Sequence, residues 1–450
     1  LDELSCYVSD PNGDVMNITG TTNPDIGFSE GLNIPDTWFT IPVGGLSYGT
    51  TYTWHVNVTD GTFWTNMTYH FTTESESEIK RKALTINHSL VAGNLVNFPV
   101  LIDITDSDLA NEAQPDGSDI YFTDINGVQL SHEIELYNAG HLVAWVNVPS
   151  LSSSVDTTLY VCYGDPGAGD PENPAAVWDA NFMMVLHLDE TSGTHYDSTI
   201  NGNNGTPMNA VNQNAAGKID GADDFDGTND YISVPHSSTI TGFTQAFTAS
   251  FWIKMDSVTG RRTILNKYNT ASSQRAWYID YDSSRGTNAL GLFVSADGSS
   301  YSYWYASFSP VAGNWYHIAV VWQSGQQPLF YVNGAAVTAT TATARASIYN
   351  NALESLYIGR SYTSGRYFDG VIDEVRISNV ARSAQWIQTC FNNQMNSSAF
   401  FTAEPEPQPP TVISHVPGVD ATGVPVGTTI TINFSEPMDR VSTEGAFSIS

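Results

Sequence analysis

The stretch FDGVIDEVRIS at residues 368–378 places an acidic side chain inside an apolar pattern. Its alternation predicts a strand that carries Asp373 and Val375 on one face. Glu374 and Arg376 would then lie on the opposite face. An acid on an apolar face is costly unless its charge is compensated. Asp373 is therefore a catalytic carboxylate, a metal ligand, or a strand-end acid that is solvated or paired with Arg376 or a backbone amide.

The stretch DSTINGNNG at residues 197–205 offers side-chain oxygens at alternate positions. Calcium is bound by hard oxygen ligands on short, tightly turned loops, and Gly202 permits such a turn. The loop lacks the closing bidentate acid of an EF-hand, so further ligands would have to come from elsewhere. We predict Ca²⁺ as a cofactor, with Asp197, Asn201 and Asn203 as ligands. A metal-free Asn/Gly hairpin is the alternative.

Aromatic side chains on two predicted strands are able to stack on pyranose rings. They lie in RAWYIDYD and in YSYWYASF, and we expect them to be exposed. A tyrosine also offers a hydroxyl group for hydrogen bonding to a sugar. The alternative is that these aromatics fill a sandwich core, as Trp252 is expected to do. We predict carbohydrate binding by Trp277 and Tyr303, in a group that includes Tyr301 and Tyr305.

Motifs for catalysis are absent from the sequence. It lacks the E-x-D-x-x-E pattern of jelly-roll hydrolases, which sets two carboxylates about 5–5.5 Å apart for retaining hydrolysis. It also lacks the G-x-S-x-G, H-E-x-x-H and P-loop patterns. Glu133 and Glu135 share one strand face in HEIELYN, which we interpret as a solvated face. His187, His236 and His317 are scattered. We predict no catalytic residue and no glycosidase activity.

Charge limits the classes of partner. The chain carries 16 basic and 47 acidic side chains, a formal charge of −31 at pH 7. This argues against nucleic acid, whose binding requires lysines and arginines against phosphate. It also argues against anionic membrane surfaces, and no apolar run approaches the ~20 residues of a membrane span. An acidic surface suits divalent cations, high salt or plain solubility.

Sequons favour an exported glycoprotein, located outside the cell or on its surface. The three cysteines, Cys6, Cys162 and Cys390, form no C-x-x-C pattern. The chain opens without an initiator methionine or a basic leader, and both ends read as strands, so we interpret it as a segment of a longer polypeptide. The predicted glycosylated residues are Asn17, Asn57, Asn66, Asn87, Asn204, Asn396 and Asn433.

Strands must position these residues, because short alternating runs recur between Gly, Asn, Asp and Pro turns. A spacing of about 8–12 residues between such runs is typical of all-β sandwiches. The helices expected are brief, such as SAQWIQTCFN at 383–392. The sequence thus predicts an all-β fold of tandem β-sandwiches, with about three domains at ~150 residues each.

Several segments resemble known modules. TYTWHVNVTDGT and TNMTYHFTT read as a hairpin closed by an Asp-Gly turn, and residues 1–75 resemble a fibronectin type III or immunoglobulin-like module, truncated at its start. The acidic linker ESESEI follows at 74–79. Residues 80–166 resemble a β-domain of unknown function, often found before laminin-G-like jelly rolls in microbial surface proteins. That resemblance rests on GSDIYFTD, HEIELYN, WVNVPSL and YVCYGDP, and it implies no activity.

The largest segment, residues 181–400, resembles the concanavalin A-like jelly rolls of laminin-G-like type. DDFDGTNDYISVP, FTASFWIKM, NWYHIAVVWQSGQQPLFYVNG and FDGVIDEVRISNVARS follow one another in the order of that family. A proline-rich spacer, EPEPQPP, occupies 404–410. Residues 411–450 resemble the start of a bacterial Ig-like module of surface-layer and adhesin proteins.

The jelly-roll resemblance bears on Asp373. Related β-glucanases have a closing strand V-D-x-V-R-V, whose Asp commonly holds a calcium ion. The segment IDEVRI matches this pattern at Asp373, Val375 and Arg376. The resemblance therefore implies that Asp373 is a metal ligand or a structural acid and not a catalyst.

Together the resemblances imply a multi-module microbial surface protein without catalysis. The jelly roll is the expected recognition element, either for adhesion or for binding a glycan or a cell-surface partner. Two alternatives stay open. One is a structural repeat that builds a surface layer, sheath or filament from copies of the chain. The other is a set of accessory modules of a larger secreted enzyme.

Overall fold

The computed structural model of the chain describes residues 2–47, 49–73, 79–165, 167–270, 273–285, 288–362, 365–404, 412–416, 422, 424–425 and 431–434. Strands make up about 51% of the structure and helices about 8%. The predicted all-β fold is therefore confirmed. The chain divides into two compact units, Leu1–Glu78 and Ile79–Ser450.

The first unit is a small sandwich of two antiparallel sheets. One sheet pairs β1 (Glu3–Val8) with β4 (Thr37–Pro42), and the other has the order β3 (Phe28–Ile34), β2 (Met16–Asn23), β5 (Thr51–Thr59), β6 (Trp64–Thr72). Ile18 and Ile41 are buried in its core. The predicted hairpin is confirmed, because β5 pairs with β6 across a turn. In that turn Asp60 accepts hydrogen bonds from the backbone N–H groups of Thr62 and Phe63, at 2.6 and 2.7 Å.

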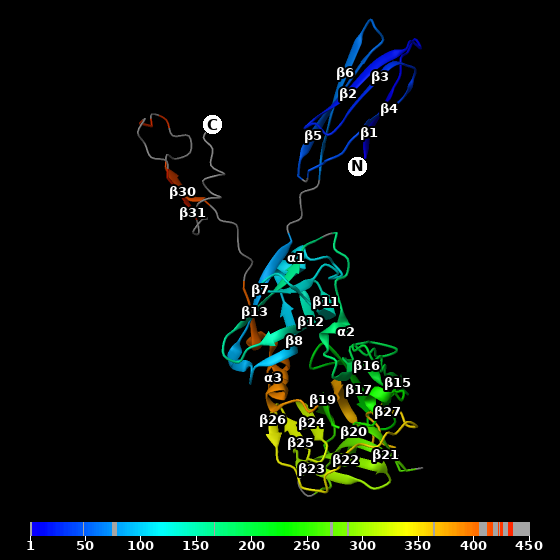
Figure 1. Cartoon of the computed structure of the whole chain (residues 1–450), viewed down its shortest axis with the longest axis vertical. Coiled ribbons are helices and arrows are strands. Elements are labelled where there is room, and N and C mark those ends of the chain that lie inside the picture. Colours follow the sequence, from blue (N-terminus) through cyan, green and yellow to red (C-terminus); the bar gives the residue numbers. More distant parts are fainter. Residues whose placement is uncertain are drawn as a thin grey trace. The chain divides into compact units, whose positions relative to one another are not determined.

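The second unit begins with a sandwich, which we call the leading sandwich (Figure 1). One of its sheets has the order β10 (Gln129–Leu130), β9 (Tyr121–Asp124), β13 (Thr157–Tyr163), β7 (Lys80–Ile86), β29 (Phe401–Ala403). The other has the order β11 (His132–Asn138), β12 (His141–Leu151), β8 (Leu95–Thr105). Residues 142–146 of β12 are all buried. Such a run requires cover on both faces of the sheet.

A jelly roll of two packed sheets follows (Figure 1). The first, which we call the β19 sheet, has the order β16 (Asn212–Ala216), β17 (Gly221–Asp226), β28 (Asp369–Ser378), β19 (Ala246–Met255), β24 (Trp315–Gln323), β25 (Leu329–Val332), β26 (Ala335–Val337), and β14 (Phe182–Leu186) also pairs with β28. The second, the β21 sheet, has the order β15 (Thr206–Met208), β18 (Tyr231–Val234), β27 (Leu356–Ile358), β20 (Arg261–Asn269), β21 (Gln274–Asp282), β22 (Ala289–Gly298), β23 (Ser302–Ser307). Phe251 and Trp304 are fully buried in the core between them.

The helices are short, as expected. They are α1 (Ser107–Glu112), α2 (Pro174–Val177), α3 (Ala384–Met395), α4 (Ser397–Phe400) and the 3₁₀ turns η1 (His88–Leu90) and η2 (Ser238–Ile240). The helix predicted over 383–392 is α3. Ser383 caps it, because its hydroxyl accepts from the backbone N–H of Trp386 at 3.1 Å. Farther on, β30 (Val412–Val416) pairs with β31 (Thr431–Phe434). Most of the predicted module at 411–450 lies outside the described residues.

The chain that leaves the jelly roll returns to the leading sandwich. Helix α3 packs on β8, where Trp386 lies edge-on against Phe98 with ring centroids 4.8 Å apart. Strand β29 then pairs with β7, with Phe401 opposite Ile86. The jelly roll is thus inserted into the leading sandwich. The end predicted for the jelly-roll domain, residue 400, falls inside this returning segment, between α4 and β29.

Asn393 on α3 holds the returning segment against β8 of the leading sandwich. Its side chain accepts from the backbone N–H of Leu101 at 2.7 Å and donates to the carbonyl of the same residue at 2.9 Å. In this way it supplies the partner that a neighbouring strand would otherwise provide. Because Asn393 is only 1% exposed, its removal leaves two buried backbone groups unpaired.

We therefore expect Asn393→Ala to lower the free energy of unfolding by about 2 kcal/mol. Urea denaturation of the whole chain, followed by tryptophan fluorescence, measures this difference. Gln388→Ala is the matched control, since Gln388 is an exposed amide on the same helix. Equal midpoints for Asn393→Ala and Gln388→Ala would contradict the role assigned to Asn393.

Candidate functional site

Asp373 is fully buried on β28, and its Oδ2 atom accepts two backbone hydrogen bonds. The donors are the N–H groups of Lys218 and Ile219, at 2.7 and 3.0 Å. Burial raises the pKa of Asp373 well above its usual range, the nearby Glu374 raises it further, and the two backbone donors lower it. The solvated strand end is therefore excluded, and a backbone-amide pairing is present. Coordination of Ca²⁺ by Asp373 stays a prediction.

A β-bulge changes the predicted faces of this strand. Glu374 has a φ of +57°, and the pairing of β28 with β19 shifts register opposite Ser250 and Trp252. Val375 consequently points into the jelly-roll core, whereas Asp373 does not share that core. The prediction that these two residues lie on one face is wrong. Two adjacent acids of one strand, at 373 and 374, are both buried as a result.

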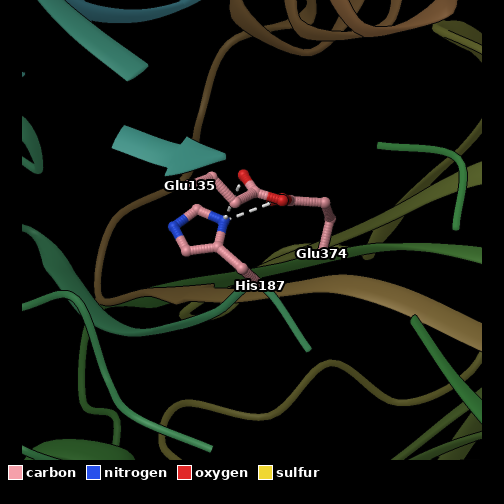
Figure 2. Close-up of side chains that lie close together, drawn as sticks. All are labelled: Glu135, His187 and Glu374. Carbon is pink, nitrogen blue, oxygen red and sulfur yellow. Dashed lines mark hydrogen bonds and ion pairs between the residues drawn. The ribbon is translucent and has the colours of Figure 1, made fainter. Parts of the chain in front are cut away.

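Glu374 belongs to a buried cluster with His187, Glu135 and Glu133, which we call the Glu–His cluster. Figure 2 shows three of its members, Glu135, His187 and Glu374. His187 directly follows β14, the two other glutamates come from β11 of the leading sandwich, and Glu374 comes from β28. Nδ1 of His187 lies 2.7 Å from Oε1 of Glu374 and 3.4 Å from Oε2 of Glu135. Its Nε2 atom lies 3.5 Å from Oε2 of Glu133. The cluster therefore joins the jelly roll to the leading sandwich.

Charges dominate this cluster. Burial lowers the pKa of His187, but the carboxylates of Glu374, Glu135 and Glu133 outweigh burial and raise it well above its usual value. Burial raises the pKa of Glu135 well above its usual range, and His187 only partly offsets this. For Glu374, burial raises the pKa, but Arg376 and His187 more than compensate, so its pKa is lowered. The carboxylates therefore favour the protonated form of His187, and the His187 charge in turn favours the ionised form of the carboxylates.

Neighbouring side chains hold the carboxylates in place. Nε1 of Trp145 donates to Oε2 of Glu135 at 2.8 Å, and Nε1 of Trp178 donates to Oε2 of Glu133 at 3.0 Å. The Arg376 guanidinium donates to Glu374 and lies over the Trp145 ring at 4.1 Å. The interpretation of Glu133 and Glu135 as a solvated face is wrong, because the strands that cover them come from the jelly roll.

The predicted calcium loop is held together by its own side chains. Asp197 accepts from the backbone N–H of Val185 at 2.9 Å and from that of Asn203 at 2.7 Å. Asn201 donates to the carbonyl of Phe182 at 3.0 Å, and Asn203 donates to that of Met183 at 2.6 Å. These contacts fasten the loop to β14. Calcium binding by Asp197, Asn201 and Asn203 stays a prediction.

The predicted sugar-binding residues differ in burial. Trp277 is fully buried in the jelly-roll core, so the expectation that it is exposed is wrong. Tyr303 is half-buried on the outer face of the β21 sheet, and Tyr301 is 49% exposed. Alternation along β21 predicts two opposite faces of the strand without saying which is buried. The face that carries Trp277 packs in the core. Trp304, between Tyr303 and Tyr305, is buried in that core as well.

The outer face of the β21 sheet carries a continuous group of rings, which we call the aromatic surface. Tyr303 lies 3.8 Å from Phe293, which stacks on Tyr278 at 4.0 Å, and Tyr303 also stacks on Tyr305 at 5.6 Å between centroids. The guanidinium of Arg285 lies 4.1 Å above the Tyr303 ring. The rings of the aromatic surface are Tyr268, Tyr278, Phe293, Tyr301, Tyr303 and Tyr305.

Polar atoms lie among these rings. Arg261 donates to Asp280 and, through its Nη2 atom, to the hydroxyl of Tyr278 at 2.5 Å. Burial raises the pKa of Asp280 to about 6, although Arg261 lowers it. Within the described residues, Oδ1 of Asp280 and the hydroxyl of Tyr303 are buried without a hydrogen-bond partner. The aromatic surface therefore combines stacked rings with ion-paired guanidinium groups, and two unpaired polar atoms are buried beneath it.

The sequon asparagines differ in their surroundings. Asn57 and Asn66 lie opposite each other on the β5–β6 hairpin. Asn17, Asn87, Asn204 and Asn396 accept hydrogen bonds from nearby backbone N–H groups, and Asn433 donates to Ser414. Glycosylation of these residues stays a prediction. Cys6, Cys162 and Cys390 are free thiols.

Family comparisons match three segments. The concanavalin A-like lectin/glucanases superfamily matches residues 226–388, a domain of unknown function (DUF2341) matches 116–209, and a bacterial Ig-like domain matches 406–450. The chain is a multi-module protein. The fibronectin-type resemblance of the first unit stays a prediction. No curated protein matches the chain.

Solved structures are similar to about half of the chain at low identity. The binding domain of Paraclostridial Mosquitocidal Protein 1 is 16% identical with a TM-score of 0.39, over 47% of this chain and 52% of that one. Domain 4 of the Geobacillus stearothermophilus arabinanase AbnA, in complex with arabinotriose, is 20% identical with a TM-score of 0.37, over 47% of this chain and 98% of that one. A botulinum neurotoxin type C structure is 15% identical with a TM-score of 0.37, over 48% of this chain and 51% of that one. The chain thus spans about half the length of the two toxin structures.

Among the described residues, no helix combines the length and the apolar character needed to cross a membrane.

Proposed function

We propose that this chain is a non-catalytic binding segment that attaches to glycans outside the cell or at its surface, through the aromatic surface of the jelly roll. The aromatic surface carries the proposal. Two of its partners, Arg261 and Arg285, belong to a set of only 16 basic residues in a chain of charge −31, yet both lie over its rings. The extracellular character of the matched module types supports the proposed location.

The geometry suits a sugar ring. A pyranose has an apolar face that stacks on an aromatic ring and hydroxyl groups at its edge that need polar partners. Tyr303 and Tyr305 are half-buried and lie beside one another, and Tyr301 on the same surface is 49% exposed. The guanidinium of Arg285 lies over both rings, its side chain is 34% exposed, and it is able to donate to a sugar hydroxyl. Because each guanidinium is already paired with an aspartate, the surface needs no charged ligand.

A glycan array probed with the whole chain tests this proposal. We expect retention of a limited set of glycans, and about tenfold weaker binding for Tyr303→Ala and for Tyr305→Ala. A loss of that size corresponds to about 1.4 kcal/mol, which is within the range for one aromatic contact. Tyr196→Ala is the matched control, since Tyr196 is 66% exposed elsewhere on the jelly roll.

Melting temperatures of all variants must be recorded beside the binding data, because Tyr303 packs on Phe293. Folded Tyr303→Ala and Tyr305→Ala variants that bind as the wild type does would refute the aromatic surface as the site. Polymers of the chain in electron micrographs, without any glycan retained, would favour the structural alternative instead.

A further inference from the structure

We propose that the Glu–His cluster binds one divalent transition-metal ion through Glu135, His187 and Glu374. The three side chains come from β11, from the residue after β14, and from β28. Their ligand atoms all lie within 4.8 Å of one another. Figure 2 shows the two carboxylates converging on the same nitrogen of the imidazole ring. The ion would bridge the leading sandwich and the jelly roll.

The spacing fits a metal ion. Zinc lies about 2.0–2.2 Å from nitrogen and oxygen ligands, which places two ligands of a tetrahedral ion about 3.4 Å apart. Nδ1 of His187 and Oε2 of Glu135 are 3.4 Å apart. Nδ1 and Oε1 of Glu374 are 2.7 Å apart, so this pair would open by a fraction of an ångström. Side-chain rotation is able to supply such a change.

Unpaired buried atoms give an independent indication of a ligand. The side chain of Glu135 is 1% exposed, and its Oε1 atom has no hydrogen-bond partner among the described residues. Nε2 of His187 is also buried without a hydrogen-bond partner there, although Oε2 of Glu133 lies 3.5 Å away. With the metal on Nδ1, the Nε2 proton would point toward that carboxylate. A carboxylate commonly orients a metal-bound imidazole in this way.

The charge of the metal-bound cluster balances. Metal binding requires a neutral imidazole and ionised carboxylates, so Glu133, Glu135 and Glu374 contribute −3 and Arg376 contributes +1. A divalent ion brings this sum of −2 to zero.

The ligand set selects the class of metal. One imidazole and two carboxylates suit Zn²⁺, Mn²⁺ or Fe²⁺. Calcium prefers six to eight oxygen ligands, about 2.3–2.6 Å away, and an imidazole is not among them. The indole N–H of Trp145 and the Arg376 guanidinium already orient the two ligand carboxylates. Because the cluster is buried, the ion would have a structural role rather than a catalytic one.

Zinc titration of the untagged whole chain, stripped with a chelator, tests the site. We expect one bound Zn²⁺ per chain by elemental analysis after dialysis, and a higher melting temperature with Zn²⁺ than with chelator. Glu135→Gln keeps an acceptor for Trp145, and we expect at least tenfold weaker Zn²⁺ binding and no zinc-dependent shift in melting. Glu190→Gln is the matched control, since it alters the carboxylate beside another buried histidine, His195, and it should bind as the wild type does.

Cobalt provides a measurement that needs no variant. Co²⁺ bound to the wild type in a low-symmetry nitrogen and oxygen site should give a visible absorption band that Zn²⁺ displaces. Absence of stoichiometric Zn²⁺ on the wild type would refute the proposal. Zn²⁺ binding that Glu135→Gln leaves unchanged, or that Glu190→Gln removes, would refute it as well.

Discussion

Replacing Asp373 with alanine should lower the free energy of unfolding of the second unit by about 3 kcal/mol. The backbone N–H groups of Lys218 and Ile219 both donate to its Oδ2 atom, and each buried donor left unpaired costs about 1–3 kcal/mol. Asp373→Asn keeps a side-chain oxygen for these donors and removes a buried acid. We therefore expect Asp373→Asn to be much closer to the wild type than Asp373→Ala.

Denaturation of the whole chain in urea, with calcium and with chelator, measures both roles considered for Asp373. Asp369→Ala is the matched control, because Asp369 lies on the same strand in a partly exposed ion pair with Arg262, and such pairs contribute little. A loss of stability in Asp373→Ala that is the same with and without calcium supports the backbone role. A calcium-dependent gain in the wild type that both Asp373 variants abolish supports the metal role. An Asp373→Ala variant as stable as Asp369→Ala would contradict both.

Raising the pH should destabilise the second unit through His195. This imidazole is fully buried, with Nδ1 2.7 Å from Oε2 of Glu190 and Nε2 2.8 Å from Oδ2 of Asp223. The amide of Gln213 also faces it, with its Nε2 atom 3.2 Å from Nε2 of His195. Burial lowers the pKa of His195, but the two carboxylates outweigh burial and raise it to about 9.

The direction of this pH effect on stability follows from the pKa of His195 in the folded and unfolded states. Unfolded histidine titrates near pH 6.5, below the folded value. The stabilisation is therefore complete below about pH 6.5 and is lost as the pH rises through about 9. At about 1.4 kcal/mol for each pH unit between the two values, the loss amounts to about 3 kcal/mol.

Urea midpoints of the wild type and of His195→Gln between pH 6 and pH 10 check this expectation. The variant should be less stable than the wild type at pH 6 and should lack most of the decline toward pH 10. His88→Gln is the control, since His88 pairs with Asp156 at the surface. An identical decline in His195→Gln and the wild type would show that another group causes it.

Local patterns determined the fold class and several of its elements. Alternation between turn residues predicted strands and an all-β fold, because side chains of a strand point alternately to opposite faces. The sequence also predicted the Asp-Gly turn between β5 and β6 and the helix after Ser383. Each of these depends on only a few neighbouring residues. The order of the jelly-roll motifs also predicted the central module correctly.

Alternation could not identify the buried face. Trp277 and Tyr278 are neighbours on β21, yet the core takes the first and the aromatic surface takes the second. At Glu374, a bulge shifts the alternation by one residue and places Val375 in the core. Pairing with β19 sets this bulge, and the local sequence carries no sign of it.

The Glu–His cluster could not be predicted from the sequence and became visible only in the tertiary structure. Glu135, His187 and Glu374 are separated by 52 and 187 positions in the sequence, and they meet because the jelly roll is inserted into the leading sandwich. Glu135 on β11 alone reads as solvated, because a polar residue on an edge strand usually faces water. Its burial depends on β14 and β28, which cover it only after the whole second unit has folded. Composition and alternation thus determined which elements form, whereas long-range packing decided which of their polar residues share one buried site.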